Sequence, residues 1–169
     1  MTRSIYVTSL HDMPLYVRDL GPSHLVSIIQ SELQPQRPPE IHETRHLRLG
    51  VHDISEPVVN GVLAQLDHVL SLIAFIDDWR PERGSLLVHC YAGVSRSTAA
   101  ALIAHVIKTG DPVASVDALR HAAPHAQPNR RLIALADSVL GFDGALIRAR
   151  ETLRDPVLVA EGALAHLRV

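Results

Sequence analysis

The sequence contains few residues that could stabilise a fold through disulfide bonds or bound metal ions. Among its 169 residues there is one cysteine, so no disulfide can form within the chain. No Cys and His spacing resembles a structural zinc site. His121 and His125 are four residues apart, but Pro124 between them argues against a helix that would present both to a metal. We therefore expect no metal and a fold held together by its own core.

An excess of charge of one sign and long apolar runs are also missing. The 16 basic and 18 acidic residues give a net charge of −2, so nothing draws the chain as a whole to nucleic acid or to an anionic membrane. No run approaches the ~20 apolar residues of a membrane span. The stretch MTRSIYVTSL is too short in apolar residues for the core of a signal peptide. We expect a cytoplasmic protein whose recognition of anions is local.

The residues that are abundant predict one globular domain over residues 1–169. Hydrophobic residues make up 47% of the chain, enough for a substantial core. Apolar and β-branched runs predict strands at 4–8, 24–30, 46–51 and 85–89. Helical spacing predicts helices at 13–20, 60–79, 97–109, 112–121 and 130–140, and more helix in the tail 141–169. Strands separated by helices indicate an α/β fold with a central, mostly parallel sheet of about four to five strands flanked by helices.

The one cysteine, Cys90, lies where a predicted strand meets a predicted helix, in the stretch VHCYAGVSRST. Backbone N–H groups of residues 91–95 would have no helical partners and would face a concavity at the positive end of the helix dipole. Gly93 permits the tight turn, and Arg96 can offer a planar fork of donors to a tetrahedral oxyanion. The same field stabilises a thiolate, the form that attacks phosphorus. A buried, inert thiol would explain the cysteine but not its neighbours.

These neighbours carry a family resemblance. His89-Cys90-(five residues)-Arg96-Ser97 resembles the His-Cys-x5-Arg-Ser/Thr signature of Cys-based protein tyrosine phosphatases. HCYAGVSRST is most similar to the dual-specificity branch in its bacterial-type form, whose loops commonly read His-Cys-x-Ala-Gly-x-Ser-Arg-Ser. The resemblance covers residues 4–140, which form the core, and leaves 141–169 as a helical extension. It implies a protein tyrosine phosphatase-like fold and a metal-independent phosphatase that needs no cofactor and forms a cysteinyl-phosphate.

The resemblance also assigns roles to individual residues. Cys90 attacks phosphorus, and Arg96 binds the equatorial oxygens. Ser97 hydrogen-bonds the thiolate and assists its departure, while His89 fixes the loop from the strand end. Ser95 tethers the loop or caps the helix. The phosphate-binding loop comprises Tyr91, Ala92, Gly93, Val94, Ser95 and Arg96.

A departing alkoxide or phenoxide needs a proton, which the family supplies from an aspartate on a mobile upstream loop. Asp53 lies 37 residues before Cys90, at the end of a predicted strand, and Glu56 is the alternative acid. As a carboxylate, Asp53 would afterwards activate water. Downstream, Pro128-Asn129 matches a Pro-Asn pair that family members often carry. Asn129 is expected to hold the phosphate-binding loop or to cap the next helix.

A protein tyrosine or dual-specificity phosphatase, with a phosphorylated protein as its partner, is the leading hypothesis. A phosphatase of a small phosphoester, a non-catalytic phospho-binding module and a sulfurtransferase are alternatives. Tyr91 and Val94 stand where phosphoinositide phosphatases commonly carry lysines, which disfavours inositol lipids. The few residues between predicted elements favour a shallow cleft, and helices in the tail could support an oligomer. No nucleic acid or membrane partner is expected.

Overall fold

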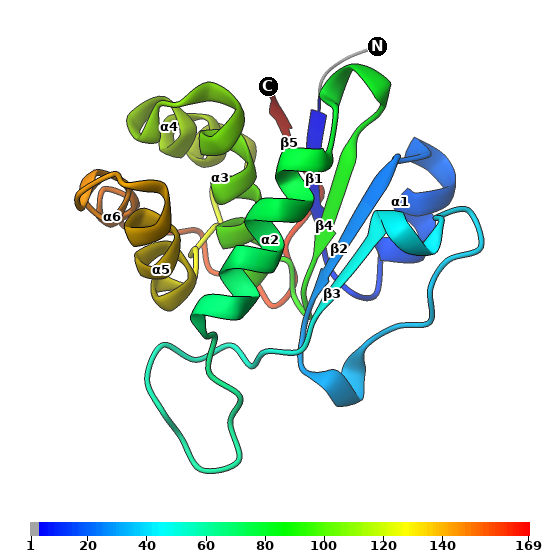
Figure 1. Cartoon of the computed structure of the whole chain (residues 1–169), viewed down its shortest axis with the longest axis horizontal. Helices are drawn as coiled ribbons and strands as arrows, with labels where there is room; N and C mark the ends of the chain where they lie inside the picture. The colour runs from blue at the N-terminus through cyan, green and yellow to red at the C-terminus, as the bar shows by residue number, and fades with distance from the viewer. Residues whose placement is uncertain (1–3) are drawn as a thin grey trace.

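The computed structural model describes residues 4–169, and a five-stranded sheet in the order β3-β2-β4-β1-β5 lies at its centre (Figure 1). The strands are β1 (Ser4–Thr8), β2 (His24–Ile28), β3 (His46–Leu49), β4 (Leu86–His89) and β5 (Ala165–Arg168). The first four run parallel, and β5 pairs antiparallel with β1. The predicted α/β fold with a mostly parallel sheet is therefore confirmed.

Helices cover the two faces of the sheet unequally (Figure 1). On one face, α1 (Met13–Leu20) packs Met13 and Val17 against Leu25 and Leu87. The other face carries α2 (Leu66–Asp78), α3 (Arg96–Thr109), α4 (Pro112–Ala122), α5 (Arg130–Leu140) and α6 (Ala145–Glu151). Short 3-10 turns lie at Ser31–Leu33, Glu43–Arg45 and Pro81–Arg83.

Helix α3 is the central helix of that second layer. Every residue from Arg96 to Val106 is buried, because small alanines let the helix pack on the sheet and on neighbouring helices at once. It ends at Gly110, which adopts φ of 76°. Next, the Asp111 side chain accepts from the N–H groups of Val113 and Ala114 and caps α4. These stop and start signals place α3 so that its N-terminus meets the end of β4.

Two predicted elements differ from the structure. Helix α2 begins at Leu66 and not at Asn60, because Asn60 takes a positive φ of 61° in a long loop that contains Pro57 and Gly61. The tail 141–169 is helical only in part: helix α6 (Ala145–Glu151) is the expected helix, and strand β5 (Ala165–Arg168) follows it instead of further helix.

The strand in the tail is not predicted from the sequence, because its alternating pattern is only four residues long. In β5, Ala165 and Leu167 are buried while His166 and Arg168 are exposed, a period of two over four residues. Asp155-Pro156 prevents the helix from continuing toward this segment. Both buried residues of β5 join the main core cluster. Within residues 4–169, no helix is long and apolar enough to cross a membrane.

Candidate active site

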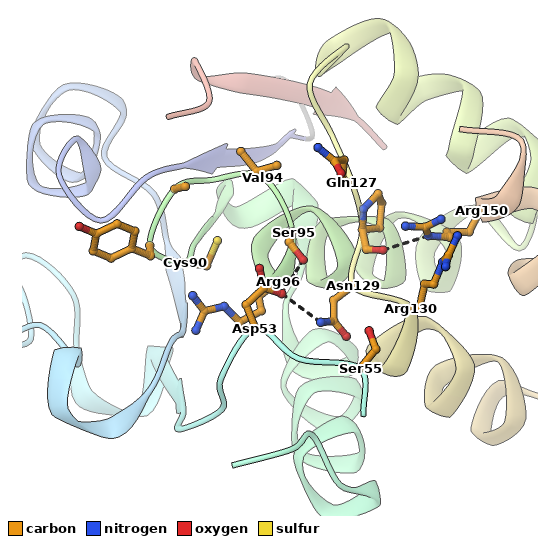
Figure 2. A pocket seen from close by; sticks show the side chains of 13 residues that line it. Asp53, Ser55, Cys90, Val94, Ser95, Arg96, Gln127, Asn129, Arg130 and Arg150 are labelled. Atoms are coloured by element: carbon orange, nitrogen blue, oxygen red, sulfur yellow. Dashed lines mark hydrogen bonds between the residues drawn. The ribbon is translucent and has the colours of Figure 1, made fainter. Parts of the chain in front are cut away.

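Cys90 immediately follows β4, the middle strand of the sheet, and residues 91–95 connect it to α3. The carboxyl ends of parallel strands are where α/β folds place their sites. A cavity of about 610 Å³ opens here (Figure 2). Its lining residues are Asp53, Ser55, Cys90, Tyr91, Ala92, Val94, Ser95, Arg96, Gln127, Pro128, Asn129, Arg130 and Arg150.

The carbonyl groups of the connecting loop are bonded to the surrounding protein. Their donors are the backbone N–H groups of Leu10 (to Tyr91, 3.0 Å), Gly162 (to Ala92, 2.7 Å), Gln127 (to Val94, 2.9 Å) and Asn129 (to Ser95, 3.2 Å). Gly93 takes φ of 73° and passes so close to Thr8 that a Cβ would lie 2.9 Å from the Thr8 carbonyl carbon. With its carbonyls held by the protein around it, the loop is left to offer N–H groups to an anion.

Cys90 and Ser97 meet at the floor of this loop. The Cys90 side chain is 2% exposed and is a free thiol. Its Sγ lies 3.1 Å from Oγ of Ser97, in the first turn of α3. The hydroxyl is therefore in position to donate to a thiolate, and the helix N-terminus adds its positive end.

His89 belongs to a chain of three buried or half-buried polar side chains behind Cys90. A carbonyl only accepts, so Nδ1 of His89 carries the proton and donates to the Cys90 carbonyl at 3.1 Å. Nε2 of His89 must then accept from the Ser27 hydroxyl, 2.6 Å away. Ser27 in turn accepts from Nε2 of His46 at 2.8 Å. Nδ1 of His46 is left as a buried lone pair without a partner among residues 4–169.

Both histidines are held neutral. Burial lowers the pKa of His89 from its ordinary 6.5 to about 4, and the nearby Arg96 acts in the same direction. Burial likewise lowers the pKa of His46 to about 4, with Arg48 adding to the effect. The chain thus fixes the Cys90 carbonyl through neutral hydrogen bonds only.

Arg96 is buried but has no carboxylate partner among residues 4–169. Its Nη1 donates to Oε1 of Gln30 at 2.8 Å and to the Val51 carbonyl at 2.9 Å. Its Nε is buried and makes no hydrogen bond to the described chain. Neutral acceptors orient the guanidinium, and its charge stays available to an anion in the cavity.

Asp53 lines the same cavity and is held from two sides (Figure 2). Oδ1 accepts from the Ser95 hydroxyl at 2.6 Å and from Nδ2 of Asn129 at 3.0 Å. Ser95 therefore bonds Asp53 and does not cap α3, for which it makes no side-chain hydrogen bond. Glu56 is exposed and lines a different cavity, beside Arg131. Of the two acids, only Asp53 shares a cavity with Cys90.

Asn129 combines the two roles that the sequence left open. Its Oδ1 accepts from Leu132 N–H at 3.1 Å and caps α5. Its backbone N–H bonds the phosphate-binding loop at Ser95, and its Nδ2 reaches Asp53. One side chain thus links the start of a helix, the loop and the acid.

The sequence did not reveal several supporting residues. Ser27 orients His89, and Gln30 orients Arg96. Their signal in the sequence is weak, because they are simply polar residues within an apolar strand and just beyond it. Gly162 and Arg150 come from the tail and carried no signal at all. Their partners lie far away in sequence, and only the tertiary fold brings them together.

The fold is that of protein tyrosine phosphatase-like α/β proteins, as comparison with solved structures shows. The crystal structure of DUSP15 matches with a TM-score of 0.62 and 24% identity, over 91% of this chain and 92% of that chain. Human DUSP28 matches with a TM-score of 0.59 and 20% identity, over 89% of this chain and 90% of that one.

Sequence comparison points to particular relatives. Dual specificity protein phosphatase 15 of Rattus norvegicus is 33% identical over 108 residues, which are 63% of this chain and 41% of the relative. The Mus musculus protein of the same name is 32% identical over 111 residues, 65% of this chain and 44% of the relative. The chain spans less than half the length of these relatives, and no family model matches it. The bacterial-type assignment stays a prediction, since these relatives are mammalian.

Proposed function

We propose that this protein is a Cys-dependent phosphomonoester hydrolase that acts on phosphotyrosine, with dual specificity for phosphoserine and phosphothreonine, in protein substrates. The observation that carries the proposal is the loop from Cys90 to Arg96. Its carbonyls are bonded to the surrounding protein, its arginine has no carboxylate partner among residues 4–169, and a thiol lies at its floor. The similarity to dual-specificity phosphatases supports the same chemistry.

The reaction follows from these positions. The phosphoryl oxygens bind the loop N–H groups and the Arg96 guanidinium, which stabilise the charge of the transition state. Sγ of Cys90 attacks phosphorus, the S–P bond forms, and the P–O bond to the leaving group breaks. Asp53 donates its proton to that leaving oxygen. Water then attacks the cysteinyl-phosphate, Asp53 takes a proton back, and the S–P bond breaks with Ser97 donating to the departing thiolate.

No metal ligand set lies in this cavity among residues 4–169. The group with the spacing of metal ligands is His11, Asp12 and Glu161, whose ligand atoms lie within 4.8 Å of one another. His11 and Glu161 line a separate cavity of about 320 Å³, on which Tyr91 also borders. The assay of the proposed function is therefore run with a chelator.

The test measures hydrolysis of p-nitrophenyl phosphate by the purified protein with chelator present. We expect turnover in the wild type, none with Cys90→Ser, and a loss of about 100-fold in kcat with Asp53→Asn, in line with general acid–base catalysis. Glu56→Gln is the matched control and should keep wild-type activity, because its side chain lies outside the cavity.

Each alternative function gives a different result. A wild type that binds phosphopeptide without turning it over is a phospho-binding module. Full activity in Cys90→Ser would rule out the thiol mechanism. A crippled Glu56→Gln beside an active Asp53→Asn would reassign the acid. Sulfur transfer from thiosulfate, with no phosphatase activity, would identify a sulfurtransferase.

A further inference from the structure

Two arginines outside the phosphate-binding loop line the same cavity as Cys90. Arg130 begins α5 and Arg150 lies in α6. Figure 2 shows them together at the end of the cavity opposite Cys90. The cavity measures about 610 Å³, roughly twenty water volumes at about 30 Å³ each, which is far more room than one phosphoryl group needs. Its far end therefore has room for a second part of a substrate.

Hydrogen bonds fix Arg150 and the backbone before Arg130 relative to the phosphate-binding loop. The segment 127–129 runs beside the loop, with Gln127 N–H bonded to Val94 O at 2.9 Å and Asn129 N–H to Ser95 O at 3.2 Å. Arg130 follows directly, with its Cα about 3.8 Å further along the chain. Nε of Arg150 donates to the carbonyl of Pro128, in the same segment, at 2.9 Å. The Arg150 guanidinium and the backbone of Arg130 are thus held at a set distance from the loop, while the Arg130 side chain is 65% exposed and bonds Glu151.

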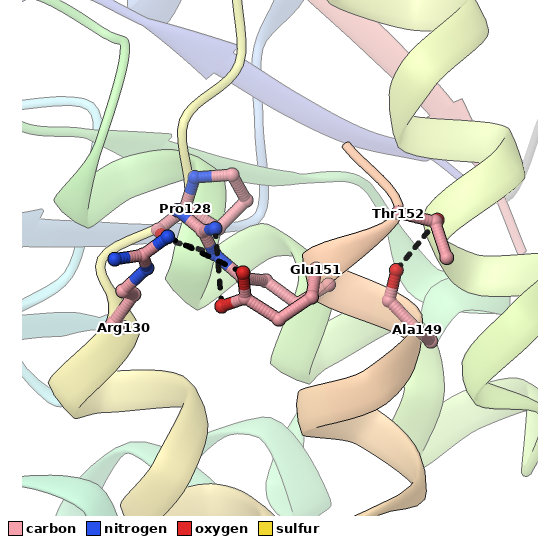
Figure 3. A network of polar contacts seen from close by, with 6 residues as sticks. Pro128, Arg130, Ala149, Glu151 and Thr152 are labelled. Atoms are coloured by element: carbon pink, nitrogen blue, oxygen red, sulfur yellow. Dashed lines mark hydrogen bonds and ion pairs between the residues drawn. The ribbon is translucent and has the colours of Figure 1, made fainter. Parts of the chain in front are cut away.

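Arg130 and Arg150 together carry more positive charge than the one carboxylate beside them neutralises. Among residues 4–169, Glu151 is the single carboxylate paired with them, at 3.2 Å from Nη2 of Arg130 and 3.4 Å from Nη1 of Arg150 (Figure 3). Both distances exceed the ~2.7–2.9 Å of strong charge-assisted bonds. The Arg150 side chain is only 12% exposed, and burial lowers its pKa from the ordinary value. Two cations share one loosely held anion, so one positive charge is left over.

We propose that Arg130 and Arg150 form a second anion subsite, which binds a carboxylate or phosphate on a residue flanking the phosphorylated residue of a peptide. The proposal rests on the proposed function. An inositol phosphate, with phosphates around its whole ring, would call for positive charge on several sides of the cavity. Here Arg130 and Arg150 are the cationic side chains that line the cavity outside the phosphate-binding loop among residues 4–169, and Tyr91, Ala92 and Val94 line it as uncharged residues. One flanking anion on a peptide matches this one-sided charge.

The test compares phosphotyrosine peptides that differ in one flanking residue. Glutamate or phosphoserine at each flanking position in turn is compared with glutamine or serine, by kcat/KM at low salt. We expect the anionic peptide to be preferred about fivefold or more at one position, through KM, and high salt to reduce the preference. Arg150→Gln and Arg130→Gln should reduce this preference to about one, and they should lower kcat/KM for the anionic peptide by more than they lower turnover of p-nitrophenyl phosphate. Glu151→Gln should increase it, because the competing carboxylate is gone.

Arg120→Gln is the matched control. Arg120 also bonds this region, through Thr152, but does not line the cavity, so its variant should keep the wild-type preference. A wild type without preference would overturn the inference. If Arg150→Gln lost activity equally on the anionic peptide and on p-nitrophenyl phosphate, the arginine pair would have only a structural role, in joining α5 to α6. Better turnover of a soluble inositol bisphosphate than of any peptide would overturn the choice of ligand.

Failure of the proposed function gives a separate result. If the wild type turns over no phosphomonoester, the same peptides are titrated calorimetrically against Cys90→Ser. Tighter binding of the anionic peptide, lost in the double variant with Arg150→Gln, supports the subsite even without catalysis. Equal binding of the two peptides overturns it.

Discussion

At the residue scale, a chain of neutral hydrogen-bonding side chains lies behind Cys90. It runs from His89 through Ser27 to His46, and it determines which protonation states this part of the site accommodates. Each bond in the chain has one allowed direction, set by the Cys90 carbonyl that can only accept. A proton added to Nε2 of His89 would leave two donors, His89 and the Ser27 hydroxyl, facing each other. This hydrogen-bond direction therefore requires a neutral His89, whereas His46 has its free lone pair at Nδ1 and is kept neutral by burial.

This neutrality predicts a loss of stability in mild acid. The unfolded chain takes up protons at these histidines near pH 6.5, whereas the folded protein keeps them neutral down to about pH 4. Because the unfolded state binds more protons in this window, the free energy of unfolding falls as the pH drops from 6.5 to 4. For the fully buried His89 the loss is about 3 kcal/mol.

Urea unfolding midpoints at pH 7.5, 6.5, 5.5 and 4.5 measure this loss. Part of the dependence of the unfolding midpoint on pH should remain in His89→Asn, because burial also lowers the pKa of other histidines. These are His24, His46, His105, His125 and His166. The exposed His121 serves as the control, and His121→Gln should follow the wild type. If the unfolding midpoint depended on pH identically in the wild type and in His89→Asn, the prediction would be contradicted.

At the scale of elements, the N-terminus of α5 is joined to the acid through one amide. Asn129 caps the helix with its oxygen and holds Asp53 with its nitrogen. An aspartate at this position keeps the capping oxygen, loses the donor and adds a second carboxylate beside Asp53.

We expect Asn129→Ala to lose about 1 kcal/mol of stability together with activity. Asn129→Asp keeps the capping oxygen, but it should lose stability at neutral pH as well as about tenfold or more in kcat, because a buried carboxylate then faces Asp53 and cannot donate to it. Urea unfolding and p-nitrophenyl phosphate turnover measure the two effects separately. Asp111→Asn, the same exchange in reverse at the cap of α4, should change neither. Wild-type turnover in Asn129→Asp would show that Asp53 does not need this bond.

At the scale of the whole molecule, β5 completes the sheet from the far end of the chain. Leu167 pairs with Ile5 of β1 and is buried in the main core cluster. Truncating it leaves a cavity in that cluster, so we expect Leu167→Ala to lose about 2–4 kcal/mol in the free energy of unfolding.

The measurement is urea unfolding at neutral pH. Arg168→Gln, on the exposed side of the same strand, should change stability by less than about 0.5 kcal/mol. A similarly small change in Leu167→Ala would mean that β5 adds little to the core.

The parallel part of this fold could be predicted from the sequence because its signals are local. Apolar runs mark β1 to β4, and Gly110, Asp111 and Pro112 mark the ends of helices α3 and α4. The loop around Cys90 was found for the same reason, since its residues are consecutive. What escaped prediction depends on distant partners: Gln30 on Arg96, Ser27 on His89 and Gly162 on Ala92. No periodicity or spacing encodes such pairs.

The bond from Gly162 to Ala92 has a consequence for the order of synthesis. A Cβ at Gly162 would lie 2.4 Å from Nε2 of His125 and 2.9 Å from the Gly93 carbonyl, so only glycine fits beside the loop. The ribosome adds Ala92 to the growing chain several seconds before Gly162, at about 5–20 residues per second. During that interval the Ala92 carbonyl lacks its partner, and β1 has an open edge where β5 will pair. A nascent chain that already contains Asp53, Cys90 and Arg96 therefore completes its phosphate-binding loop only after Gly162 has been synthesised.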